Sequence, residues 1–186
     1  MKNKIWIFIV IAAFFIGFST GKSKPVKHLH VLTGGEVYFT PGTQCEDRII
    51  ENINKAQIID LAVYSITNTK ITNALLNAKR RGAKIRIVTD RTMAGNKGSK
   101  DEILIKAGIP LRKNKKHKIE HNKFAVFDGK KGVTGSYNWT NAATYKNAEN
   151  CLFFDDASVQ KYEERFKHLW QLNKDAYRKK ELKNRQ

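Results

Sequence analysis

Hydrophobic residues along the chain recur at two periods, one typical of strands and one typical of helices. Short apolar or β-rich runs predict strands at residues 37–40, 58–66, 84–89, 109–111, 124–127, 132–136 and 150–154. Apolar residues at helical spacing predict helices over residues 49–56, 71–78, 101–107 and 159–172. Early strands alternate with helices, whereas Asp128-Gly129 joins two later strands as a tight hairpin turn. We therefore predict an α/β fold, an α+β sandwich in which helices flank a mixed β-sheet.

The N-terminal residues 1–21 differ from the rest of the chain. Lys2 and Lys4 precede an apolar run over residues 5–18, and small residues follow at positions 19–21. This order is typical of a secretory signal peptide, and the run is short for a membrane span, which needs about 20 residues. Residues 19–21 do not form a clean Ala-x-Ala cleavage site, so an uncleaved N-terminal anchor is the alternative. Either interpretation predicts an exported protein, periplasmic or secreted.

The remaining chain divides by composition into a linker, one domain and a tail. Residues 22–34 are polar and basic and predict a linker, residues 35–172 carry all the predicted strands and helices, and residues 173–186 predict a basic tail. The whole chain has 35 Lys and Arg against 17 Asp and Glu, a net charge of +18. This balance favours a polyanionic partner, either nucleic acid or an anionic membrane surface. Charge alone does not choose between them.

Two cysteines, Cys45 and Cys151, fall in the predicted domain. An oxidising compartment permits a disulfide between them. Two unpaired, partly buried thiols are the alternative, and the sequence leaves both open.

One cluster of residues carries recognisable chemistry. His121 and Lys123 are two residues apart on a predicted strand, and Ser136 and Asn138 have the same spacing at the end of its hairpin partner. Residues two apart on a strand share a face, so the four groups can converge. Lys and Asn suit the non-bridging oxygens of a phosphate, and an imidazole can attack phosphorus to form a covalent phospho-enzyme. Glu149, just before the next strand, is a candidate to set the imidazole tautomer.

Basic and aromatic residues flank this cluster. The basic stretch over residues 112–118, with Lys115, Lys116 and Lys118, predicts a track for a phosphate backbone, although a solvated face is the alternative. Tyr64 and Trp139 can either stack on bases or pack in the core. His117 and His121 are four residues apart, a metal-binding spacing only on a helix, and this stretch is predicted as loop entering strand. We predict neither a metal site nor a cofactor.

The spacing of these residues resembles a known motif. His121-x-Lys123-x4-Asp128-x6-Gly135-Ser136-x-Asn138 resembles the HKD motif of the phospholipase D superfamily, with every fixed position filled. Residues 138–143 and 146–150 are similar to the small bacterial HKD endonucleases of the Nuc type, and the likeness extends over about residues 37–170. The resemblance implies a phospholipase D-like catalytic domain over residues 35–172.

The resemblance also implies roles for the motif residues. His121 would be the nucleophile that forms a phosphohistidine, and a second histidine would protonate the leaving oxygen. Lys123 and Asn138 would neutralise the phosphate, Ser136 would add a hydrogen bond, and Glu149 would orient His121. Asp128 completes the catalytic motif, although its expected position is away from the phosphorus, tying down the turn. No metal is implied.

The motif occurs once, and larger members of the superfamily carry it twice. A two-fold homodimer would therefore bring two copies of His121 to one shared site. The predicted activity is a metal-independent endonuclease acting on DNA or RNA. A phospholipase D that hydrolyses phospholipid headgroups is the alternative, because the same motif cleaves them. A non-catalytic nucleic-acid-binding protein is a further alternative, but such a protein needs no nucleophilic histidine.

Overall fold

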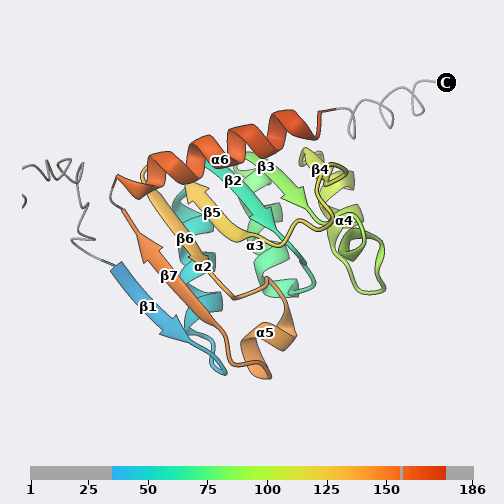
Figure 1. Ribbon diagram of the computed structural model, residues 1–186. Helices are drawn as coiled ribbons and strands as arrows, with labels where there is room; N and C mark the ends of the chain where they lie inside the picture. Colours follow the sequence, from blue (N-terminus) through green and yellow to red (C-terminus); the bar gives the residue numbers. More distant parts are fainter. Residues whose placement is uncertain (1–34, 156, 175–186) are drawn as a thin grey trace, which may run out of the picture. The chain divides into compact units, whose positions relative to one another are not determined.

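The structure is a computed structural model that describes residues 35–155 and 157–174. The predicted signal segment, the linker up to residue 34 and the tail from residue 175 lie outside these residues. The described part folds around a seven-stranded sheet of order β1-β7-β6-β5-β2-β3-β4 (Figure 1). The strands are β1 (Gly35–Phe39), β2 (Ile58–Val63), β3 (Lys84–Thr89), β4 (Leu111–Lys113), β5 (Lys123–Phe127), β6 (Lys131–Gly135) and β7 (Asn150–Phe154). The helices are α2 (Gln44–Lys55), α3 (Thr69–Arg80), η1 (Met93–Gly95, a 3₁₀ turn), α4 (Asp101–Lys106), α5 (Asn141–Tyr145) and α6 (Ser158–Leu172).

The sheet is mixed, as predicted from the pattern of elements. β2, β3 and β4 run parallel, whereas β5, β6 and β7 form an antiparallel meander attached to β2, and β1 pairs antiparallel with β7 at the edge of the sheet. The parallel part is built through the helical crossover of α3, and the antiparallel part through the hairpin at Asp128. Helices α2 and α3 cover one face of the sheet and α6 covers the other (Figure 1). None of the described helices is long and apolar enough to cross a membrane.

Several predicted elements differ in their bounds, most clearly β4 and β2, and the short helices η1 and α5 were not predicted. β4 covers Leu111–Lys113, two residues later than predicted. Ile109 is buried in the core, which explains its apolar character, but the pairing with β3 starts only at Leu111. β2 ends at Val63, earlier than predicted. The short helix α5 was not predicted, because five residues are too few to show a helical period; its start is fixed by Thr140, whose Oγ1 accepts the Ala143 N–H at 3.1 Å.

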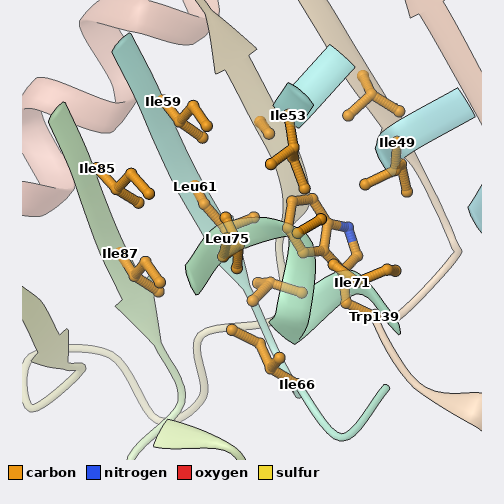
Figure 2. Packing of buried hydrophobic residues seen from close by; sticks show 14 of the residues in the cluster. Ile49, Ile53, Ile59, Leu61, Ile66, Ile71, Leu75, Ile85, Ile87 and Trp139 are labelled. Atoms are coloured by element: carbon orange, nitrogen blue, oxygen red, sulfur yellow. The ribbon is translucent and has the colours of Figure 1, made fainter. Parts of the chain in front are cut away.

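Two apolar layers stabilise the sheet. The larger layer lies between the sheet, α2 and α3, where Ile53, Leu75 and Trp139 are fully or almost fully buried (Figure 2). The smaller layer packs Phe166 and Leu169 of α6 against Phe124 of β5. Each such side chain contributes roughly 1.5–3 kcal/mol when it is removed from water. The central strands β2 and β5 are therefore held from both faces, which gives the ends of these strands fixed positions.

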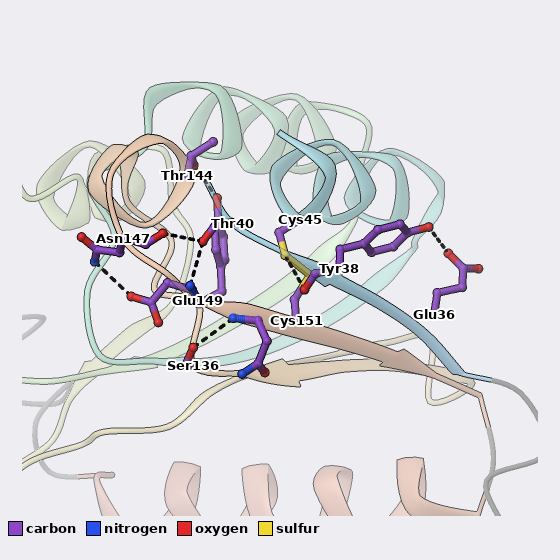
Figure 3. The surroundings of a disulfide bond; sticks show 11 residues. Glu36, Tyr38, Thr40, Cys45, Ser136, Thr144, Asn147, Glu149 and Cys151 are labelled. Carbon is purple, nitrogen blue, oxygen red and sulfur yellow. Dashed lines mark hydrogen bonds between the residues drawn. A yellow bond between two sulfur atoms is a disulfide. The ribbon is translucent and has the colours of Figure 1, made fainter. Parts of the chain in front are cut away.

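Cys45 and Cys151 form a disulfide, which decides between the two alternatives left open by the sequence. The bond joins the first turn of α2 to β7, and the two residues are separated by 106 positions in the chain. Both cysteines are buried. Figure 3 shows the bond between α2 and the start of β7, near Glu149.

Candidate active site at one edge of the sheet

The strand ends that carry the predicted site residues meet at one edge of the sheet. β2 and β3 end there, β5 begins there, β6 ends there and β7 begins there, as their pairing shows. Phe124 pairs with Thr134, and Gly135 pairs with Cys151. The register therefore brings the start of β5, which follows His121, next to the GSYN segment (residues 135–138) and the start of β7. The predicted hairpin of β5 and β6 is present, although His121 precedes β5 and Ser136 and Asn138 follow β6.

His121 lies two residues before β5, whereas the sequence placed it within a strand. β2 ends at Val63, which pairs with Lys123, so no partner strand continues to His121. The imidazole is exposed and packs edge-on against the ring of Tyr64, with a centroid distance of 4.8 Å and an interplanar angle of 62°. An exposed imidazole held by one aromatic contact is accessible to a substrate.

Lys123 is the first residue of β5, and its side chain is buried. Its Nζ donates a hydrogen bond to the backbone oxygen of His121 at 2.6 Å and lies 5.2 Å from the ring centroid of Tyr64. Burial lowers the pKa of Lys123, and the nearby carboxylates of Glu149 and Glu120 oppose that shift. A desolvated ammonium with two acidic neighbours suits the binding of a phosphate oxygen, because a phosphate restores the hydrogen bonds that water would provide.

The GSYN segment, residues 135–138, turns sharply away from β6. Gly135 has a φ of 150°, and a Cβ there would lie 2.2 Å from the backbone oxygen of Asn150, so only glycine fits. Ser136 is exposed, and its Oγ accepts the Asn150 N–H at 3.1 Å (Figure 3). Asn138 is half-buried, and its Oδ1 is shielded from water without a hydrogen-bond donor among the described residues. A buried acceptor without a donor lowers the stability of the fold, so its presence here points to a functional role.

A buried polar network fixes the GSYN segment from behind. The hydroxyl of Tyr137 is hydrogen-bonded to Thr144 Oγ1 at 2.6 Å, and burial raises the pKa of Tyr137 to about 12. The fully buried carboxylate of Glu46 accepts hydrogen bonds from Asn68 Nδ2 and, at 2.7 Å, from Lys70 Nζ. These contacts connect α2, α3 and α5 to the loop that carries Asn138. A buried network whose polar groups are hydrogen-bonded to one another holds the loop in one conformation.

Glu149 is held at the start of β7 by Thr40. The Glu149 N–H donates to Thr40 Oγ1 at 2.9 Å, and the Thr40 N–H donates to the Glu149 backbone oxygen at 3.0 Å. Among the described residues, the Glu149 carboxylate accepts a hydrogen bond from Asn147 Nδ2 at 3.0 Å and none from His121 (Figure 3). The role of Glu149 in orienting His121 therefore stays a prediction. Thr40 was not singled out in the sequence, where it marked only the end of a strand.

Asp128 lies at the opposite end of β5 from Lys123. The intervening strand is about 17 Å long. Asp128 has a φ of 53° and its Oδ1 accepts the backbone N–H groups of Gln57 and Ile58, both at 2.8 Å. The carboxylate therefore fastens the β5–β6 turn to the start of β2, although it belongs to the sequence motif.

The predicted basic track lies on the loop between β4 and β5. Lys115, Lys116 and Lys118 are all exposed. The loop is anchored by the fully buried Asn114, whose Oδ1 accepts the N–H groups of Lys116 and His117 at 3.2 Å. Asn173, just after α6, accepts the Lys115 N–H at 3.0 Å. These two anchors could not be predicted from the sequence, since isolated Asn residues are common in polar segments.

Comparison with known proteins places this arrangement in a family. The family model described as "Cardiolipin synthase, PLD-like domain" matches residues 49–170. This chain belongs to the phospholipase D superfamily. Within it, a phospholipase D of Rickettsia conorii is 40% identical over 139 residues, 74% of this chain and 68% of that protein. A mitochondrial cardiolipin hydrolase of Danio rerio is 33% identical over 152 residues, 80% of this chain and 67% of that protein.

A solved structure shows the same fold. Nuc from Salmonella typhimurium, a phospholipase D family member, has a TM-score of 0.70 and 28% sequence identity, covering 75% of this chain and 95% of that one. The predicted phospholipase D-like fold is thereby confirmed. The chain is a phosphodiesterase of the phospholipase D superfamily. Among its described residues, no group of three or more His, Cys, Asp or Glu side chains is arranged to hold a metal ion.

Proposed function

We propose that this phosphodiesterase is an endonuclease that cleaves DNA, and RNA by the same chemistry, through a phosphohistidine on His121. The observation that carries the proposal is the common edge of the sheet, where an exposed imidazole adjoins a buried ammonium and the GSYN segment. Such a site can bind a phosphodiester and attack it with its own side chains.

In the first step, a ring nitrogen of His121 forms a bond to phosphorus while the bond to the leaving oxygen breaks. Lys123 Nζ and Asn138 bind the non-bridging oxygens, on which negative charge is concentrated. A protonated histidine donates its proton to the leaving oxygen. In the second step, that histidine, now neutral, takes a proton from water, the water oxygen attacks phosphorus and the bond to His121 breaks. The products are a phosphomonoester end and a free hydroxyl.

The proton donor is assigned to His121 of the partner subunit. The described residues contain one HKD motif, and their other histidines lie at positions 117 and 168, outside the motif. A two-fold axis through the site brings two identical motifs together and completes the acid–nucleophile pair. The proposed enzyme is therefore a homodimer whose active site needs both chains.

Charge and family likeness support nucleic acid as the substrate. The exposed lysines at positions 115, 116 and 118 lie on the loop that leads directly into His121, where a phosphate backbone would pass. The chain also resembles Nuc in structure. The relatives named phospholipase D and cardiolipin hydrolase favour a phospholipid as the second candidate substrate. An anionic membrane surface would be attracted to the same lysines.

Export is part of the proposal. The buried disulfide between Cys45 and Cys151 is the type of bond that persists in an oxidising compartment. A periplasmic or secreted location, with or without the N-terminal segment as an anchor, provides this condition. Fractionation of the native host, with an antibody to the folded domain, tests it; recovery of the protein in the cytoplasm would contradict it.

The substrate is tested by offering DNA, RNA and vesicles of phosphatidylcholine or cardiolipin in parallel, with EDTA present. We expect cleavage of the nucleic acids and its loss in His121→Ala. His117→Ala is the matched control, because His117 lies on the same loop and is also exposed. Hydrolysis of lipid alone would replace the endonuclease with a phospholipase. Binding of DNA without cleavage would indicate a non-catalytic binding protein.

The shared site is tested by mixing. Wild-type enzyme exchanged with excess His121→Ala protein should lose activity, because mixed dimers contain one histidine where two are required. Adding the same excess of a variant with a distant substitution, such as Lys84→Ala at the start of β3, should not inhibit and should raise the total activity, because every dimer then still contains two copies of His121. A monomeric mass at concentrations that support full activity would contradict the shared site.

A further inference from the structure

Tyr64 contacts two residues of the motif, His121 and Lys123. It follows β2 directly, and its backbone N–H donates to the Asn122 oxygen at 2.9 Å. Its backbone oxygen accepts a hydrogen bond from Thr89 Oγ1 at 3.4 Å. The backbone of Tyr64 is thus fixed to the segment between His121 and Lys123 on one side and to the end of β3 on the other.

The ring of Tyr64 is engaged by both motif side chains. The imidazole of His121 lies 4.8 Å from it in an edge-to-face arrangement, and Lys123 Nζ lies 5.2 Å from its centroid. Aromatic pairs prefer this tilted geometry because the positive edge of one ring meets the negative face of the other. A cation near an aromatic face is attracted by the same quadrupole, more strongly where water is excluded. The half-buried ring therefore has little free surface on which a base could stack.

We infer that Tyr64 is a positioning residue that sets the direction of the His121 imidazole and the place of the Lys123 ammonium. In this role the aromatic ring matters and the hydroxyl does not, because none of the hydrogen bonds between described residues uses Tyr64 Oη. The inference deepens the proposed function and rests on it, since it assigns the geometry of that same site. The inferred role differs from both interpretations of Tyr64 made from the sequence, which were stacking on bases and packing in the core.

The test compares Tyr64→Phe, which keeps the ring, with Tyr64→Leu, which keeps the apolar bulk. Steady-state kinetics are measured on a DNA oligonucleotide, on the same oligonucleotide with tetrahydrofuran abasic residues around the cleavage point, and on bis(p-nitrophenyl) phosphate. We expect the Phe variant to stay within about twofold of wild type. We expect the Leu variant to lose about 10- to 100-fold in kcat on all three substrates, with KM nearly unchanged.

The outcomes separate the inference from its rivals. A rise in KM on the base-containing oligonucleotide, with no loss on the abasic one, would show base stacking and overturn the inference. Unchanged kcat in a folded Leu variant would overturn it as well. Loss of kcat in the Phe variant would assign the role to the hydroxyl instead. If wild type cleaves bis(p-nitrophenyl) phosphate and no nucleic acid, the proposed substrate fails while the test of Tyr64 still stands.

An activity-independent signal covers the case in which the Leu variant is poorly folded. The ring protons of His121 in wild type should show the ring-current shift of a neighbouring aromatic ring in NMR spectra. The shift should persist in Tyr64→Phe, and the His117 resonances serve as the unshifted reference, because among the described residues His121 packs against an aromatic ring and His117 does not. His121 ring protons that resonate at the same position as those of His117 in wild type would overturn the inference.

Discussion

Lys123 Nζ donates a hydrogen bond to the backbone oxygen of His121 at 2.6 Å, so the cation of the motif is tied to the residue that carries the nucleophile. The two are separated by one residue, and the bond closes a compact loop at the start of β5. Because Lys123 is buried, its ammonium has few solvent partners, and this bond fixes one of its three donors. The remaining donors are available to a phosphate oxygen.

Activity should decline at alkaline pH through deprotonation of Lys123. Burial lowers the pKa of this lysine below its ordinary 10.5. The protonated form binds phosphate, and it is lost as pH rises through the lowered pKa. We therefore expect the alkaline limb of the kcat/KM profile to fall below pH 10.5, measured on DNA at constant ionic strength.

Lys123→Arg provides the matched comparison for this limb. A guanidinium stays protonated throughout the accessible range, so the variant should have lower activity but a flatter alkaline limb. An alkaline limb at the same pH in the Arg variant would assign the titration to another group.

Asp128→Ala should lower stability and leave the chemistry intact. The substitution removes the acceptor of the Gln57 and Ile58 N–H groups and places Ala at a φ of 53°. We expect a loss of about 2–3 kcal/mol in the free energy of unfolding, measured by urea denaturation. Asp128→Asn keeps an acceptor oxygen and tolerates the same φ, so it should lose less. A large fall in kcat of folded Asp128→Asn would show a direct role in catalysis.

The sequence predicted the order of strands and helices but not every feature of the site. The periodicity of apolar residues and the Asp128-Gly129 turn were enough to place His121 and Ser136 at one edge, because antiparallel pairing follows from the hairpin. Contacts between residues distant in the chain were not predictable in this way. The Thr40–Glu149 hydrogen bonds and the disulfide join segments more than 100 positions apart. Only the folded sheet brings such residues together.

Gly135→Ala should disrupt the site through its backbone. The added Cβ would lie 2.2 Å from the Asn150 oxygen, and the φ of 150° is unfavourable for an L-residue. We expect a stability loss of about 1–3 kcal/mol, together with a fall in kcat as the GSYN segment shifts. Gly95→Ala is the control, since a Cβ there meets no atom within 4 Å. Thermal melts and DNA cleavage by both variants test this, and equal behaviour of the two would contradict it.

Removal of the disulfide should destabilise the domain. Crosslinked residues 106 positions apart restrict the unfolded chain strongly, a stabilisation of about 4–5 kcal/mol in the chain-entropy account. Urea unfolding of wild type with and without reductant, and of the Cys45→Ala/Cys151→Ala double variant, measures the loss. Reductant should have no effect on the double variant. Equal stability of oxidised and reduced wild type would contradict the prediction.

The exposed lysines beside His121 should determine how steeply DNA binding depends on salt. Each lysine that neutralises a phosphate contributes about 0.9 to the slope of log K against log salt concentration. Substitution of Lys115, Lys116 and Lys118 by Ala should therefore reduce the slope by up to about 2.7 and weaken binding at low salt most. Lys55→Ala/Lys84→Ala/Lys130→Ala is the control, with the same charge change at the opposite edge of the sheet. Fluorescence anisotropy with His121→Ala as the shared background measures binding without cleavage. If the control triple variant reduces the slope as much as the test triple variant, the lysines act through net charge alone and the loop between β4 and β5 is not a backbone track.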